Sequence, residues 1–158
     1  MQTTLRQPTG LTGIGVHSGQ TVSLILHPAE ANTGISFYRV VGDESRQVEI
    51  PADYRHVNAT ELCTAVGVAG ASVATIEHLM ATLSALAIDN VIVEIDGPEV
   101  PVMDGSAEPF IDAIDRVGVA VLAAPRRYIK ILKPVRRADE SSPRRASIIE
   151  CRVVGKRP

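Results

Sequence analysis

The spacing of apolar and polar residues predicts several β-strands in the first part of the chain. The segment Thr21–Pro28 begins with apolar Val22, Leu24 and Leu26 in alternation with other residues, which is typical of a strand with one buried face. Residues 90–95 are rich in β-branched side chains and end at an Asp-Gly-Pro turn signal, so they form the clearest strand. Shorter strands, each bounded by Gly, Pro, Asp or Asn, are predicted over residues 34–41, 47–50 and 62–68.

Two segments have the spacing of amphipathic helices. Between Ser72 and Ala87 apolar side chains recur at steps of three and four residues, and Ser72 is the expected N-cap. A second helix is expected after Ser106 as N-cap, with Pro109 in its first turn and Gly118 at its end. A mixed or antiparallel sheet with two helices on one face makes an α+β fold, a two-layer sandwich.

Charge divides the chain near residue 125. Residues 1–125 carry 5 basic and 15 acidic side chains, whereas residues 126–158 carry 11 basic and 3 acidic ones. A strand-like alternation runs from residue 127 to 135, and the polar stretch that follows has no periodicity. We therefore predict a first domain over residues 1–125, one further strand within 126–135 and a disordered basic tail over 136–158.

Composition excludes several classes of protein. No apolar run reaches the roughly 20 residues that a membrane span needs, so no integral membrane segment is expected. The first residues lack the basic-then-apolar profile of a signal peptide, and two cysteines, Cys63 and Cys151, are too few for a disulfide framework. A reduced, cytoplasmic protein is predicted. The basic residues 126–158 include Tyr128 as their one aromatic residue and no amphipathic helix, so nucleic acid is not an expected partner.

The adjacent residues Glu77 and His78 form the pair with the clearest chemical potential. On a helical wheel His78 lies opposite the apolar stripe, among small residues such as Ala81. A neutral imidazole can ligate zinc, and a neighbouring carboxylate can take a proton from water at the metal. The other interpretation is a solvated Glu and His on the outer face of a helix, and spacing alone favours it, because the sequence is not HExxH.

A Gly-rich segment, TGIGVHSG at residues 12–19, resembles a phosphate loop only superficially. Ser18 stands where the dinucleotide fingerprint has its third Gly, and no Lys-Ser/Thr pair follows. We interpret it as a turn between two strands. Cys63 has no basic neighbour in the sequence, so the sequence does not favour it as a nucleophile.

Several longer motifs follow one another along the chain. They are LTGIGVHSG (11–19), HPAEANTGI (27–35), LCT (62–64) and TIEHLMATLSALAIDNVIVEIDGPEVPVMDGSAEPF (75–110). In this order, from about Leu5 to about Val135, they closely resemble the UDP-3-O-acyl-N-acetylglucosamine deacetylases. These are zinc hydrolases that commit the lipid A pathway of Gram-negative bacteria, and they remove acetate from the 2-amino group of the sugar.

The resemblance implies a site and a role for individual residues. Family members have two similar α+β domains with the active site between them, so residues 126–135 would begin the second domain. By resemblance, His78 is one of three ligands of Zn²⁺ and Glu77 is the general base. Leu62 and Cys63 would lie beside the zinc site and the passage for the acyl chain. The implied substrate is UDP-3-O-acyl-N-acetylglucosamine.

The sequence also departs from the family pattern. The second domain of the family supplies a His-x-x-x-Asp pair of zinc ligands and a further catalytic His, whereas no histidine follows His78 here. From about Arg136 the sequence is expected to leave the family, which suggests a first domain with an aberrant tail from a truncated or frame-shifted gene. Such a chain carries half of the active site and is expected to be inactive alone. The alternative is a non-catalytic remnant or interaction module of the same fold. The oligomeric state stays open.

Overall fold

The computed structural model describes residues 1–41, 46–68, 70–128, 133–135 and 149–151. The contacts between residues divide the chain into two compact units, Met1–Ala124 and Pro125–Pro158. Every residue of the candidate site lies in the first unit.

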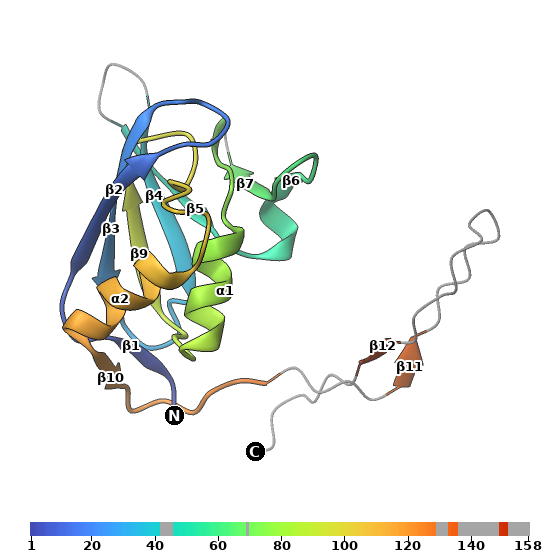
Figure 1. Ribbon diagram of the computed structural model, residues 1–158. Coiled ribbons are helices and arrows are strands. Elements are labelled where there is room, and N and C mark those ends of the chain that lie inside the picture. Colours follow the sequence, from blue (N-terminus) through green and yellow to red (C-terminus); the bar gives the residue numbers. More distant parts are fainter. Residues whose placement is uncertain (42–45, 69, 129–132, 136–148, 152–158) are drawn as a thin grey trace. The chain divides into compact units, whose positions relative to one another are not determined.

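A five-stranded mixed sheet forms the base of the first unit (Figure 1). Its strands, in spatial order, are β2 (Thr9–Ile14), β3 (Thr21–Pro28), β9 (Val91–Ile95), β4 (Ile35–Val41) and β5 (Arg46–Pro51). The pairing of β4 with β9 is parallel, and the other three pairings are antiparallel. Four of these strands, β3, β4, β5 and β9, match predicted ones.

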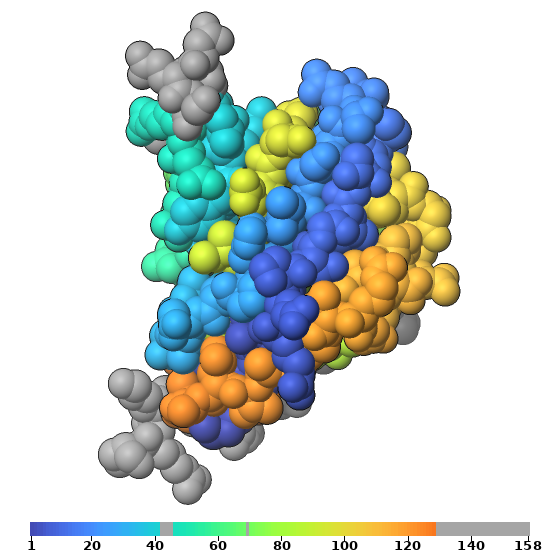
Figure 2. All heavy atoms as spheres, turned by 90° about the vertical axis from the view of Figure 1, so that its left-hand side faces the viewer, coloured from blue at the N-terminus to red at the C-terminus, as the bar shows by residue number. Residues whose placement is uncertain are grey.

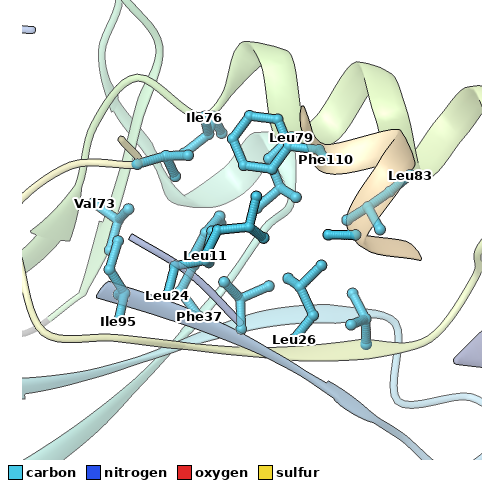
Figure 3. Packing of buried hydrophobic residues seen from close by; sticks show 14 of the residues in the cluster. Leu11, Leu24, Leu26, Phe37, Val73, Ile76, Leu79, Leu83, Ile95 and Phe110 are labelled. Carbon is cyan, nitrogen blue, oxygen red and sulfur yellow. The ribbon is translucent and has the colours of Figure 1, made fainter. Parts of the chain in front are cut away.

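Two helices, α1 (Glu77–Ala85) and α2 (Glu108–Val117), cover one face of this sheet (Figure 1). Figure 3 shows their apolar side chains packed against those of the strands. The buried set includes Leu24, Leu26 and Phe37 from the sheet and Leu79, Leu83 and Phe110 from the helices. Figure 2 shows the opposite face, where β3, β9 and β4 lie at the surface. The α+β class is thereby confirmed.

Helix α1 begins later than predicted, at Glu77, and Ser72 is not its N-cap. Ser72 lies in a strand, β8 (Ala71–Val73), and the next residue, Ala74, forms backbone hydrogen bonds with Pro98 and Val100. Thr75 then adopts a left-handed conformation with φ of 57°, which an α-helix does not accommodate. The buried Val73 and Ile76 produced a helical period, although Val73 belongs to a strand.

Helix α2 also begins slightly later than predicted. Its N-cap is Ala107, and Ser106 precedes it, although the Ser106 hydroxyl still accepts a hydrogen bond of 3.1 Å from the amide of Glu108. Pro109 lies in the first turn, as predicted. Gly118 ends the helix with φ of 75°, and its N–H donates to the carbonyl of Ile114, as expected for a glycine at this position.

A smaller three-stranded sheet consists of β6 (Val57–Ala59), β7 (Ala65–Val68) and β8, with a short 3₁₀ helix, η1 (Tyr54–His56), before β6. The predicted strand over residues 62–68 therefore starts only at Ala65. Leu62 has φ of 63°, and this left-handed conformation places it in a loop.

Two short strands that the pattern did not reveal join the ends of the first unit. They are β1 (Thr3–Leu5) and β10 (Val119–Val121), and they pair antiparallel. Each has three residues, too few for a periodicity, so their pairing depends on the tertiary structure.

In the second unit, β11 (Lys133–Val135) pairs antiparallel with β12 (Ile149–Cys151). Strand β11 falls in the predicted strand region, whose residues 129–132 lie outside the described part. Strand β12 is a regular element within the segment expected to be disordered; the rest of that segment, residues 136–148 and 152–158, is not described. No helix in the described ranges is long and apolar enough to cross a membrane.

Candidate active site at the start of helix α1

Glu77 and His78 occupy the first turn of α1, where the loop before β7 meets the helix. The backbone N–H of Thr64 donates a hydrogen bond to Oε1 of Glu77. In the reverse direction, the N–H of Ile76 donates to the carbonyl of Thr64 over 3.4 Å. These two hydrogen bonds hold the Leu62–Thr64 loop against the start of the helix and fix one oxygen of the carboxylate.

The pKa of Glu77 lies below its usual value. Partial burial by itself raises this pKa, but hydrogen bonds from the backbone N–H groups of Glu77 and Thr64, together with the nearby His78, outweigh burial. Glu77 is therefore a carboxylate at neutral pH. One of its oxygens is held by the protein, and the group is in its proton-accepting, ionised form.

The imidazole of His78 is oriented by the chain that follows β9. Its Nε2 atom lies 3.0 Å from the backbone carbonyl oxygen of Gly105. Because a carbonyl only accepts hydrogen bonds, Nε2 carries the proton in this arrangement, and the lone pair of the neutral ring is on Nδ1. In this arrangement Nδ1, which carries the lone pair, is the nitrogen that could bind a metal ion.

The MDGSA motif builds the turn that presents this carbonyl. Met103 has φ of 55°, and Asp104 accepts hydrogen bonds from both the backbone N–H and the hydroxyl of Ser106, at 2.9 and 2.8 Å. Bonds of this kind stabilise an Asx turn. From the sequence, Ser106 was expected only as the N-cap of α2, and the contact of this turn with His78 was missed because Gly105 and His78 are 27 residues apart.

Leu62 and Cys63 precede Thr64, which contacts Glu77. Leu62 is 90% exposed, and Cys63 is half-buried with a free thiol. The loop therefore brings both residues to the same end of α1 as Glu77 and His78. Their predicted part in binding an acyl chain stays a prediction.

The described residues do not by themselves fit a complete zinc site. A catalytic zinc commonly has about three protein ligands. In the ranges that the structure describes, no three side chains of His, Cys, Asp or Glu are grouped so that they could hold a metal ion. His78 offers one donor nitrogen, and its neighbour Glu77 is engaged by Thr64.

The Gly-rich segment forms the turn between β2 and β3, as interpreted from the sequence. Its backbone N–H groups do face an anion, but the anion is the protein's own carboxylate. The N–H groups of His17 and Ser18 lie 3.1 and 2.6 Å from Oε1 of Glu99. Sequence reasoning missed Glu99, because its partners are 81 and 82 residues away.

Comparison with known proteins places this arrangement in a family. A model of the LpxC family, described as UDP-3-O-acyl N-acetylglycosamine deacetylase, matches residues 2–151. The chain belongs to this family. The resemblance inferred from the motifs between Leu11 and Phe110 is confirmed.

Curated members of the family match most of this chain. The UDP-3-O-acyl-N-acetylglucosamine deacetylase of Photobacterium profundum is 49% identical over 139 residues, which are 87% of this chain and 45% of the relative. That of Syntrophotalea carbinolica is 48% identical over 151 residues, which are 96% of this chain and 48% of the relative. The chain spans about half the length of these deacetylases.

The family model matches further along the chain than the motifs that carried the resemblance. The resemblance was expected to end near residue 135, and the family model extends to residue 151. The match of the family model therefore reaches the end of strand β12. The aberrant tail over residues 136–158 stays a prediction.

Proposed function

We propose that this chain forms one half of the active site of a zinc-dependent deacetylase that acts on UDP-3-O-acyl-N-acetylglucosamine. The reaction removes acetate from the 2-amino group in lipid A synthesis, in the cytoplasm. The observation that carries the proposal is the carboxylate of Glu77, held by the Thr64 amide beside His78 at the start of α1, in a chain of this family.

Glu77 has the role of general base. Its lowered pKa keeps it ionised at neutral pH, and the Thr64 N–H fixes the direction of the carboxylate. It takes the proton of the water that attacks the amide carbon. A positioned base of this kind contributes roughly 10² to 10⁴ in rate.

His78 has the role of a zinc ligand. The Gly105 carbonyl fixes the ring and leaves one nitrogen with a lone pair, which is the usual way in which a ligating imidazole is oriented. Zinc in such an enzyme polarises the amide carbonyl and activates water. The remaining ligands must come from groups outside the described residues, and the family resemblance assigns them to a second domain.

Leu62 and Cys63 have the role of contacts for the acyl chain. The side chain of Leu62 is 90% exposed and therefore available for contact. The loop that carries Leu62 is held near Glu77 by the hydrogen bond from the Thr64 amide. An apolar chain that covered Leu62 would remove this surface from water.

The second candidate function is a non-catalytic module of the same fold. It is favoured by one observation, the absence of a three-donor metal group among the described residues. The two candidates predict different behaviour when the missing half is supplied.

The test is a chimera in which residues 1–135 replace the matching part of the Photobacterium profundum deacetylase. We expect the chimera to release acetate from UDP-3-O-acyl-N-acetylglucosamine. Glu77→Gln should then lower kcat by about 10² or more, whereas the exposed Glu30→Gln should not. A folded but inactive chimera, or one indifferent to Glu77→Gln, would support the non-catalytic module instead.

A further inference from the structure

Glu99 is a buried carboxylate that joins two distant segments of the chain. Its exposed fraction is 2%. Its oxygens accept hydrogen bonds from the backbone N–H groups of His17 and Ser18 in the β2–β3 turn. They also accept one of 2.9 Å from the hydroxyl of Thr75. All of these described partners are neutral donors.

The turn between β2 and β3 is shaped around this carboxylate. A Cβ atom at Gly15 would lie only 2.4 Å from Oε1 of Glu99, so a larger residue there would have to displace the carboxylate. The turn is closed by two backbone bonds, from the N–H of Gly15 to Gln20 and from that of Gly19 to Gly15. The turn and the segment after β9 lie at the same end of the sheet (Figure 1). Glu99 thus takes the place that an external anion has in a phosphate loop.

Glu99 also holds Thr75, the residue before the N-cap of α1, Ile76. Thr75 is β-branched and has φ of 57°, a conformation that is unfavourable for such a side chain and persists only when its surroundings impose it. The Thr75 hydroxyl is bonded to Glu99. On either side of Glu99, Pro98 and Val100 form backbone bonds of 3.0 Å with Ala74.

We propose that Glu99 is a positioning residue for the Glu77–His78 site. By fixing Thr75 in its left-handed conformation, the buried carboxylate sets where α1 begins and therefore where Glu77 and His78 project. It touches neither residue among its described contacts and acts through Thr75. The inference rests on the proposed function, in which Glu77 and His78 are the reactive groups.

Hydrogen exchange of the Thr64 amide reports this positioning without substrate or metal, because that amide donates to Glu77. The quantity to measure by NMR is the exchange rate of Thr64 divided by that of the amides in central strand β9. A variant that merely destabilises the whole domain accelerates both rates, whereas a displaced Glu77 accelerates Thr64 alone.

In Glu99→Gln we expect this ratio to rise about tenfold, the effect of losing one ordinary hydrogen bond. Thr75→Val, which removes only the hydroxyl, should raise it similarly, and Thr75→Ser, which keeps the hydroxyl, should leave it near the original value. Glu30→Gln is the control for loss of an exposed carboxylate. If Glu99→Gln does not fold, the Thr75 pair decides the question.

An unchanged ratio in both Glu99→Gln and Thr75→Val would overturn the proposal. Equal effects of Thr75→Val and Thr75→Ser would do the same, because they would show that the hydroxyl is not the link. A raised ratio together with an inactive chimera would leave the positioning role intact and remove the deacetylase function, so the two proposals fail separately.

Discussion

Glu99 makes the stability of the first unit depend on pH. Burial by itself raises the pKa of Glu99, but hydrogen bonds from Ser18, Thr75 and the His17 amide outweigh burial and hold this pKa below 4.5. The folded state therefore favours the ionised form, and the resulting stability is present above pH 4.5 and is lost as the pH falls through the lowered pKa.

Urea unfolding at pH 7 and at successively lower pH values measures this effect. We expect the free energy of unfolding to fall as the pH drops below about 4.5. In Glu99→Gln the fall should be smaller, because the amide does not titrate. If Glu99→Gln and the original chain lost stability in parallel, Glu99 would not be the group responsible.

Gly15 lies at a point of the β2–β3 turn where a Cβ atom has no room unless its neighbours move. In Gly15→Ala the new Cβ would lie 2.4 Å from Glu99 and 2.5 Å from the Ser18 hydroxyl. Overpacking of this kind costs about 1–3 kcal/mol. Gly10→Ala is the control, because its Cβ would have no contact closer than 3.6 Å. Denaturant midpoints of both variants measure the difference, and equal midpoints would contradict the prediction.

At the scale of the element, helix α2 is held to the sheet mainly by its buried side chains. Phe110 is fully buried, whereas the next residue, Ile111, is partly exposed. Phe110→Ala should therefore lower the free energy of unfolding by about 3–5 kcal/mol, and Ile111→Ala by clearly less. Urea unfolding of the two variants gives the comparison, and a similar loss in both would mean that α2 does not pack as described.

At the scale of the whole molecule, this chain should bind zinc weakly. His78 is one nitrogen donor, and the described residues supply no group of three donors. Zinc titration followed through the NMR signals of the His78 ring should show weak binding that His78→Ala removes. A tight complex of one zinc per chain that depends on His78 would contradict this, unless a second copy of the chain supplies ligands.

Local pattern was sufficient for four strands of the five-stranded sheet and for one helix boundary. The alternation from Thr21 and the β-branched run before Ile95 gave the strands β3 and β9 correctly, because period-two spacing needs only neighbours in sequence. Gly118 ended α2 as predicted, because the glycine that ends a helix is also a local signal. The motifs around Glu77 and His78 were also sufficient to recognise the family, because a motif is defined by the order of its residues alone.

The start of α1 and the arrangement of the site were decided by the tertiary structure. Buried Val73 and Ile76 have helical spacing, yet the strand-like pairing of Ala74 and the bond from Thr75 to Glu99 exclude a helix before Glu77. Neither contact has a local signal, because a hydrogen bond between residues 24 apart depends on the sheet that brings them together. The sequence by itself determined the family and predicted Glu77 and His78 as the reactive residues. The tertiary structure decided which groups position these residues. A buried carboxylate such as Glu99 needs hydrogen-bond donors, and the fold supplies them from segments that are distant in the sequence.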